Sequence, residues 1–356
     1  MKRFVIEERD ELKNITAYDG APQKPGMLLD ANESAWAMPE KVRAKVVEKL
    51  GGIAFNRYPQ IDANDLREKI AKDFSFTKEN VQLGNGSSEL LYACCYAFGG
   101  AGRKIAYISP SFSMYKVYVE MSGSIDKPFS LEEDFMLDYE KLKNFIAEEQ
   151  PHVLIICNPN NPTGTHYDKE KLLCALKNSS CLVVMDEAYM EFASGSMVDV
   201  LNDNHNMIVM RTFSKAYGLA SNRIGYALCA NKDIIKTLTK VLLPYHINAM
   251  TLTVAGTVWD NRDKYESSIE SIMKERELFA GELDGIGIKV YPSKTNFLFF
   301  TLGSEEKNKK LINLLLEKSI YLRDFSSSQL LGGIRMTIGR PEENREVLSV
   351  IKECSK

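Results

Sequence analysis

Four side chains at or just beyond the ends of predicted strands belong to types that act together in chemistry. Lys215 follows the apolar run MIVMRT, and a lysine emerging from a core into a cleft can form a Schiff base with an aldehyde. Asp186 ends the run CLVVMD, and a carboxylate beside a pyridine nitrogen raises the pKa of that nitrogen. Asn161 in CNPNNPTG and Tyr189 in MDEAY can each donate a hydrogen bond to a phenolate oxygen. These residue types predict a site for pyridoxal phosphate.

A second set of residues is suited to the phosphate of such a cofactor. Hydroxyl and guanidinium groups near Lys215 can hold a phosphate, and so can the free backbone N–H groups at the start of the helix predicted in GNGSSELL. This set comprises Thr212, Ser214, Arg223, Gly86, Ser87 and Ser88. Phe112 in SPSFSMY could stack on the pyridine ring. GNGSSE lacks the third glycine of a dinucleotide-binding fingerprint, and no Walker lysine motif is present.

Each of these residues also has a structural explanation when it is taken alone. A lysine is commonly solvated, an aspartate at a strand end is often a helix cap, and an asparagine before a proline commonly forms a turn. Ser87 or Ser88 could be a plain helix N-cap, and Phe112 could belong to the core. The prediction of a cofactor site therefore depends on their joint occurrence.

The elements that must position these residues alternate between short apolar strands and helical patterns. Strands are predicted at residues 104–109, 152–157, 181–186, 207–212 and 224–229. The runs at 152–157 and 181–186 are apolar almost throughout, which is typical of central strands covered on both faces. This pattern predicts an α/β fold with a mostly parallel, doubly wound sheet, in which ligands bind at the carboxyl ends of strands.

The pattern changes after Pro244. A long amphipathic helical stretch at about residues 251–283 precedes predicted strands at 288–292, 296–302 and 334–339, which indicates a smaller α+β domain. The first 45 residues carry little regular pattern. We therefore predict an N-terminal arm at 1–45 that contributes to the small domain, a large cofactor-binding α/β domain at 46–248 and a small C-terminal domain at 249–356.

Composition narrows the functional classes. A chain of 356 residues exceeds one compact core, and its 44% hydrophobic and 26% charged residues are ordinary for a globular protein. The net charge of −3 offers no footprint for nucleic acid or an anionic membrane. No signal peptide or run of 18 apolar residues is present, so we expect a cytoplasmic protein. The seven cysteines form no metal-ligand pattern and are predicted to be buried, reduced thiols, so no metal is expected.

The order and context of these motifs resemble the fold-type I pyridoxal-phosphate aminotransferases. Over nearly the whole length, the chain is most similar to the histidinol-phosphate aminotransferases. The motifs that carry this resemblance include LDANES, NRYP, GNGSSELL, SPSFSMY, NPNNPTG, DEAYMEF, RTFSKAYGLA, TNF, LRDF and GIRMTIGR.

The resemblance implies roles for individual residues. Lys215 would carry the cofactor as a covalent aldimine and then serve as the base that moves a proton between substrate and cofactor. Tyr58 in NRYP would reach the cofactor phosphate of a second subunit, which implies a homodimer. Arg323 and Arg335 would bind the anionic groups of substrates, and Tyr18 would line the substrate pocket. Surface salt bridges are the alternative explanation for the arginines.

The reaction implied is the exchange of an amino group between L-histidinol phosphate and 2-oxoglutarate, by a ping-pong mechanism, in histidine biosynthesis. Guanidinium groups can bind both phosphate and carboxylate, as two alternating substrates require. The chain departs from the family pattern at Ala17, in the run SAWAMPE, at Ser88 and at Asn222. The first two departures lie in loops near the substrate pocket and therefore bear on the identity of the donor.

Three other functions are compatible with parts of this pattern. A threonine-phosphate decarboxylase would use the same lysine and aspartate but release carbon dioxide. An aromatic amino-acid aminotransferase would differ in the breadth of its pocket. A transcription regulator with an aminotransferase-like domain would need a helix-turn-helix segment, for which the short N-terminal arm leaves no room.

Overall fold

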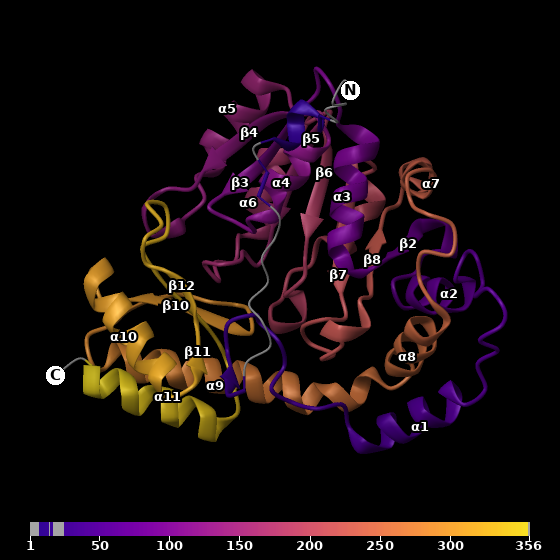
Figure 1. Cartoon of the computed structure of the whole chain (residues 1–356). Helices are drawn as coiled ribbons and strands as arrows, with labels where there is room; N and C mark the ends of the chain where they lie inside the picture. The colour runs from indigo at the N-terminus through magenta and orange to yellow at the C-terminus, as the bar shows by residue number, and fades with distance from the viewer. Residues whose placement is uncertain (1–6, 14, 17–24, 355–356) are drawn as a thin grey trace, which may run out of the picture.

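The computed structural model describes residues 7–13, 15–16 and 25–354. Within these ranges the chain forms two sheet-based regions, a large one whose sheet runs from purple to red and a smaller one whose sheet and helices are orange to yellow (Figure 1). Each has its own hydrophobic core. The predicted pocket residue Tyr18 lies outside the described residues.

The large region is built on a seven-stranded sheet with strand order β2-β8-β7-β6-β5-β3-β4. Only β8 runs antiparallel to its neighbours, so the predicted mostly parallel sheet is confirmed. Every residue of β5 and β6 is buried and both strands lie inside the sheet, as their unbroken apolar runs predict. The strands are β2 (Val81–Gly84), β3 (Lys104–Ser109), β4 (Ile125–Ser130), β5 (Val153–Cys157), β6 (Leu182–Asp186), β7 (Met207–Thr212) and β8 (Gly225–Leu228).

Helices cover both faces of this sheet. Successive residues of a strand point to opposite faces, so each central strand contributes to two core clusters. Along β5, Val153 and Ile155 pack in one core cluster with α3, α4 and α7, whereas Leu154 and Ile156 pack in another with α2, α5, α6 and α8. The helices are α2 (Asn64–Asp73), α3 (Gly86–Phe98), α4 (Met114–Met121), α5 (Tyr139–Glu149), α6 (Lys169–Leu176), α7 (Lys232–Thr239) and α8 (Ala249–Trp259), and α1 (Glu40–Leu50) lies against α8.

The small region combines an antiparallel sheet of order β12-β13-β10-β9 with three helices, which confirms the predicted smaller α+β fold. The N-terminal segment joins it, because β1 pairs in parallel with β11 and Leu29 is part of its core. Figure 1 shows this indigo segment beside β11. The elements are β1 (Met27–Leu28), β9 (Lys289–Tyr291), β10 (Phe297–Thr301), β11 (Ile320–Tyr321), β12 (Arg323–Phe325), β13 (Gly333–Thr337), α9 (Glu266–Asp284), α10 (Glu305–Glu317) and α11 (Pro341–Cys354).

The long helix predicted at about residues 251–283 is interrupted in the structure. It is divided into α8, a 3-10 turn at Arg262–Tyr265 and α9. Asn261 leaves the helical conformation, and its side chain donates back to the Thr257 carbonyl at 2.8 Å. Val258 and Trp259 belong to the core of the large sheet, whereas α9 packs in the small core. The apolar periodicity continues across this break, so it predicts one helix where the structure has two.

The surface features outside the strand ends are ordinary. Five of the seven cysteines are buried, as predicted, but Cys174 is exposed and Cys354 is partly exposed.

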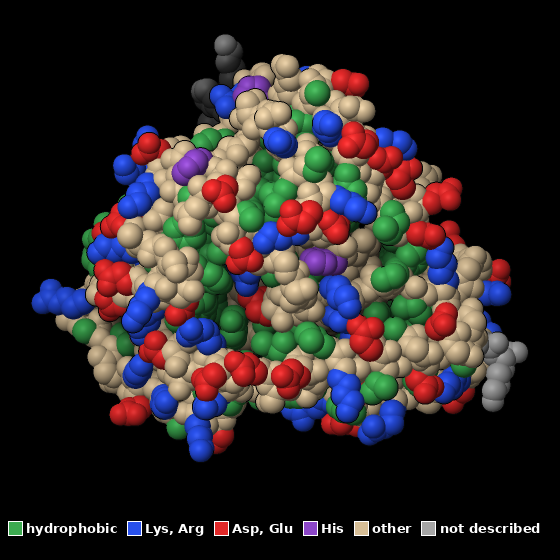
Figure 2. Space-filling view, turned by 180° about the vertical axis from the view of Figure 1, so that it is seen from behind, with side chains coloured by type: hydrophobic (Ala, Val, Ile, Leu, Met, Phe, Trp, Pro, Cys, Tyr) green, Lys and Arg blue, Asp and Glu red, His purple; other side chains and the backbone are tan. Residues whose placement is uncertain are grey.

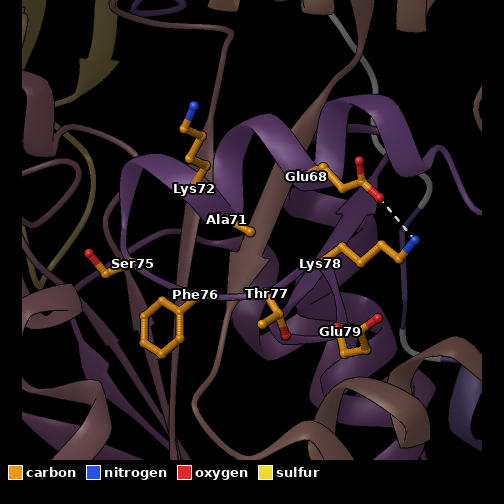
Figure 3. A pocket seen from close by; sticks show the side chains of 8 residues that line it. All are labelled: Glu68, Ala71, Lys72, Ser75, Phe76, Thr77, Lys78 and Glu79. Carbon is orange, nitrogen blue, oxygen red and sulfur yellow. Dashed lines mark hydrogen bonds and ion pairs between the residues drawn. The ribbon is translucent and has the colours of Figure 1, made fainter.

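Basic and acidic side chains are interspersed over the face in Figure 2. A hollow of about 530 Å³ lies beside α2, crossed by the Glu68–Lys78 ion pair, and none of its lining residues is a predicted site residue (Figure 3). No helix in the described ranges is long and apolar enough to cross a membrane.

Candidate active site

The carboxyl ends of β5, β6 and β7 bring half of the predicted cofactor residues together. The three strands are adjacent and parallel, so the residues that follow them emerge at one edge of the sheet. Backbone hydrogen bonds continue past the strand ends, from Asn158 N to Asp186 O at 3.0 Å and from Glu187 N to Met210 O at 2.9 Å. These bonds hold the loop that carries Asn161 beside Asp186.

Asp186 is a buried carboxylate with neutral hydrogen-bond donors. Its Oδ2 accepts from the Tyr115 hydroxyl at 2.7 Å, and its Oδ1 accepts from the Ala188 N–H at 3.2 Å. Burial raises the pKa of Asp186 to about 6, because the charged form loses hydration. A cation placed beside this carboxylate would offset that loss. Tyr115 was not predicted as a site residue, because its place on the apolar face of α4 gives no sign of a polar role.

Lys215 follows β7 and the Thr212–Ser214 turn. Its Nζ donates a hydrogen bond to the Ala31 carbonyl oxygen at 3.0 Å. Burial, followed by the positive charge of Arg335, lowers the pKa of Lys215 to about 8. A larger share of this amine is therefore neutral near pH 7 than for a solvated lysine, and the neutral amine is the nucleophile that an aldehyde requires.

The predicted phosphate residues meet around the start of α3. The Thr212 hydroxyl donates to Ser214 Oγ at 3.0 Å. Gly86 has a φ of 74°, and a Cβ atom there would lie 2.7 Å from Arg223 Nη2, so only glycine allows this approach. A Cβ at Gly225 would lie 2.5 Å from Ser87 N, which brings β8 equally close to the helix start. Ser88, at the next position, lies near the Tyr118 hydroxyl.

Three further predicted cofactor residues, Tyr189, Asn161 and Phe112, each contact another side chain near the site. Tyr189 is buried, and its hydroxyl accepts from Asn32 Nδ2 at 2.9 Å. Asn161 Oδ1 accepts from Arg335 Nη1 at 2.6 Å, so its Nδ2 group is the part able to donate to a ligand. Phe112 packs edge-on against Tyr115 with ring centroids 5.6 Å apart. Asn32 was not predicted as a site residue, because nothing in LDANES links it to Tyr189, which lies 157 residues away.

The two predicted substrate arginines lie side by side on the small sheet. Arg323 of β12 is directly opposite Arg335 of β13, so both side chains occupy one face. Each guanidinium carbon lies 5.8 Å from the centre of the Phe325 ring. Arg335 is only 8% exposed and also donates to the Asp30 carbonyl oxygen, whereas Arg323 is exposed. The buried Arg335 side chain is therefore held in place, whereas the exposed Arg323 side chain on the same face is free to change its conformation.

Tyr58 lies apart from these groups within the chain. Its side chain is 80% exposed and stacks on Tyr245 with ring centroids 4.5 Å apart. The structure therefore brings together the predicted cofactor residues and the two arginines but leaves Tyr58 on the surface.

The arrangement fits a phosphorylated pyridine aldehyde. It offers a buried carboxylate for a ring cation, an amine with a lowered pKa for the aldehyde and a glycine-lined helix start beside an arginine for the phosphate. The sequence profile of the aminotransferase class I and II family matches residues 24–351. The chain belongs to this family. The predicted fold, aminotransferase activity and pyridoxal phosphate cofactor are thereby confirmed.

Relatives of this aminotransferase cover nearly the whole chain. A histidinol-phosphate aminotransferase from Thermoanaerobacter pseudethanolicus is 38% identical over 347 residues, which is 97% of each chain. The structure of histidinol-phosphate aminotransferase from Sinorhizobium meliloti in complex with pyridoxal-5'-phosphate has a TM-score of 0.85 at 23% identity and covers 92% of this chain and 90% of its own. L-threonine-O-3-phosphate decarboxylase from Porphyromonas gingivalis has a TM-score of 0.77 at 25% identity, covering 91% and 98%.

Proposed function

We propose that this aminotransferase exchanges the amino group between L-histidinol phosphate and 2-oxoglutarate, giving imidazole acetol phosphate and glutamate, as a step of histidine biosynthesis. The observation that carries this proposal is the pair of opposed arginines, Arg323 and Arg335, on the face reached by Asn161. Both proposed substrates are anions, and guanidinium groups bind phosphate and carboxylate alike. The full-length similarity to a histidinol-phosphate aminotransferase supports this choice of donor.

The site residues divide the work of holding the cofactor. Pyridoxal phosphate, when bound, supplies an electron sink for the substrate carbon. We assign Asp186 to keep its ring nitrogen protonated, Asn161 and Tyr189 to donate to its phenolate oxygen, and Phe112 to stack on its ring. The phosphate is assigned to hydroxyl, guanidinium and backbone N–H groups of Thr212, Ser214, Arg223, Gly86, Ser87 and Ser88.

Lys215 is assigned two tasks that both need a neutral amine. Its Nζ would hold the cofactor through the aldehyde group and would take the proton from the substrate Cα. A pKa of about 8 suits both tasks, because the amine can lose and regain its proton near neutral pH. Two anionic substrates that share one pair of arginines must bind in turn, so a ping-pong order follows.

Absorption spectroscopy tests the donor. Histidinol phosphate is added alone to the purified holoenzyme, so that only the first half-reaction can run. We expect the absorbance of the pyridoxal form to be replaced by that of the pyridoxamine form, and later addition of 2-oxoglutarate to restore it. An unchanged spectrum with histidinol phosphate would rule out this donor. A panel of aromatic amino acids under the same conditions measures overlap with aromatic aminotransferases.

Phosphothreonine decarboxylation is the second candidate, because the decarboxylase from Porphyromonas gingivalis shares this fold over 91% of the chain. Its proposed substrate is also an amine that carries an anionic phosphate, which the two arginines could bind. Carbon dioxide release from threonine phosphate, together with no response to histidinol phosphate, would favour this reaction. The fold is common to both candidates, so the products are what separate them.

We also propose a homodimer in which Tyr58 binds the cofactor phosphate of the second subunit. The surface beside Tyr58 supports this: Tyr58 stacks on Tyr245, and their sequence neighbours Phe55 and Leu243 are each 74% exposed. We expect Tyr58→Phe to weaken cofactor retention roughly tenfold, since one hydrogen bond to a charged group is lost. Retention is measured by dialysis and absorbance. Sedimentation that shows an active monomer would contradict the proposal.

A further inference from the structure

Three consecutive residues of the N-terminal segment touch three of the site residues. The Asp30 carbonyl accepts from Arg335, the Ala31 carbonyl accepts from Lys215 Nζ at 3.0 Å, and Asn32 Nδ2 donates to the Tyr189 hydroxyl at 2.9 Å. The first two contacts use backbone oxygens, which any residue could supply. Only the third depends on a side chain, so Asn32 is the position where the sequence of this segment matters to the site.

The Asn32 amide is held in one orientation by its surroundings. Asn32 is 1% exposed, and its backbone N–H donates to Thr337 Oγ1 at 2.9 Å. The Thr337 hydroxyl therefore acts as an acceptor there and directs its own hydrogen to Asn32 Oδ1, at 3.4 Å. The Asn32 carbonyl accepts from Asn296 Nδ2 at 3.0 Å. With Oδ1 facing Thr337, the Nδ2 group faces Tyr189.

The backbone of Asn32 also favours this residue type. Its φ is 55°, in the left-handed region that asparagine tolerates better than most residues other than glycine. An asparagine here combines a permitted backbone with an amide N–H₂ group that can only donate.

This donor fixes what the Tyr189 hydroxyl can do. An amide N–H₂ group has no lone pair for a hydrogen bond, so Tyr189 must accept from Asn32 and cannot give its own proton to that atom. Among the described residues, no hydrogen bond is recorded in which the Tyr189 hydroxyl donates. Tyr189 is 4% exposed, so its proton remains for a ligand in the site rather than for bulk water.

We propose that Asn32 is a positioning residue that directs the Tyr189 proton to the phenolate oxygen of the bound cofactor. This inference rests on the proposed role of Tyr189 in the cofactor site. Its role in this proposal passes through Tyr189 and requires no contact with substrate or cofactor. It acts by occupying the acceptor side of the hydroxyl, which leaves the donor side for the cofactor.

A pH titration of the visible absorbance of the resting holoenzyme tests the proposal without turnover. A donor to the phenolate stabilises the chromophore that has lost its proton, so weakening that donor raises the chromophore pKa. Asn32→Asp keeps the shape but offers Tyr189 an acceptor, and we expect a rise of about one pH unit. Asn32→Gly permits the left-handed backbone and removes the amide; we expect a smaller rise in the same direction.

The effect must pass through Tyr189, and a double-mutant cycle checks this. Asn32→Asp should shift the chromophore pKa in the parent but not in a Tyr189→Phe background. Asn308→Asp is the matched control, because Asn308 is also fully buried and donates to Thr301 Oγ1 and the Gly332 carbonyl, within the small region. That control should leave the chromophore pKa unchanged.

The outcomes separate this inference from the proposed cofactor site. If Tyr189→Phe leaves the chromophore pKa unchanged, the assigned role of Tyr189 is wrong and the inference falls with it. If Tyr189→Phe raises the pKa but neither Asn32 variant does, the inference on Asn32 alone is overturned. A shift of equal size with and without the Tyr189 hydroxyl would also overturn it, because Asn32 would then act by another route.

Discussion

The residues proposed to hold the cofactor and those proposed to hold substrate anions lie on two different sheets. Among the cofactor residues, Asn161, Asp186 and Lys215 lie at or beyond the ends of parallel strands β5, β6 and β7, whose carboxyl ends meet at one edge. The arginines instead face each other across the antiparallel pair β12–β13 and reach the site by contacts with Asn161 and the Asp30 carbonyl. The positions of the cofactor residues, which form the cofactor half of the site, are therefore set by the large sheet itself. The positions of the two arginines, which form the substrate half, depend on how the small region packs against the large one.

Lys215→Ala should have the largest effect, because it removes the amine assigned to bind the cofactor aldehyde. We expect the visible absorbance of covalently bound cofactor and all measurable turnover to be lost, while thermal unfolding stays cooperative. Absorbance and circular dichroism on the same sample measure both. Lys294→Ala, which changes an exposed lysine paired with Glu277, is the control and should retain colour and activity. A coloured, active Lys215→Ala enzyme would contradict the cofactor assignment.

Asp186→Asn should divide function from stability within the cofactor half. We expect turnover to fall roughly 100-fold to 1000-fold, because an amide cannot hold the ring nitrogen protonated. Without cofactor, the same variant should be the more stable protein at pH 8. The pKa of Asp186 is raised to about 6 in the folded chain, against roughly 3.9 when unfolded, so its penalty grows between those values and is full above pH 6.

Chemical denaturation of the cofactor-free proteins at several pH values measures this difference. We expect Asp186→Asn to gain about 2 kcal/mol over the parent at pH 8, and the gain to disappear as the pH falls toward 4. A gain that stays constant over this pH range would show that ionisation of Asp186 is not its source.

The two arginines should differ in the way that their burial differs. Arg335→Lys should raise KM for both substrates roughly 10-fold to 100-fold, because a planar fork that binds Asn161 and a ligand at once is replaced by a point charge. It should also shift the absorbance of the bound cofactor, because Arg335 holds Asn161, which is assigned to donate to the phenolate oxygen. Arg323→Lys changes an exposed side chain, so we expect a smaller rise in KM and an unchanged spectrum. Equal spectral shifts in both variants would contradict this division.

The same contrast explains what the sequence could predict. Asp186, Lys215 and Asn161 each follow an apolar run that is recognisable as a strand, so their meeting at one sheet edge follows from the topology alone. The grouping of Arg335 with Arg323 came only from resemblance to a known family, because antiparallel register is not readable from short strands. Strand β4 was not predicted, since Pro128 interrupts its pattern at the edge of the sheet.

The residues that prediction missed are those defined by contacts across long stretches of chain. Asn32 meets Tyr189, and Tyr115 meets Asp186, at sequence separations of 157 and 71 residues. Neither pair leaves a spacing pattern, because partners on different elements have no common period. Both contacts involve residues assigned to the cofactor, but their partners Asn32 and Tyr115 come from other segments, the N-terminal segment and α4.

Phe135 offers the finest test, because it links the two halves without touching a polar site group. It lies in the loop after β4, its φ is 62° and that of Asp134 is 59°, and its ring packs on Tyr291 and Phe299 at centroid distances of 4.7 and 5.6 Å. Phe299 is directly opposite Arg335 in the small sheet. Two consecutive left-handed residues persist only where packing holds them, and here the ring contacts of Phe135 with Tyr291 and Phe299 tie this segment to the small sheet.

We expect Phe135→Ala to raise KM for both substrates about threefold, with kcat and the chromophore pKa nearly unchanged, because only the face that carries the arginines loses support. It should also lower the free energy of unfolding by about 3 kcal/mol. Phe129→Ala is the matched control, since Phe129 is similarly buried (7% exposed against 8%) but packs on Phe145 in the large core. If both variants raise KM equally, the loss of stability accounts for the effect, and the two halves do not depend on Phe135 for their alignment.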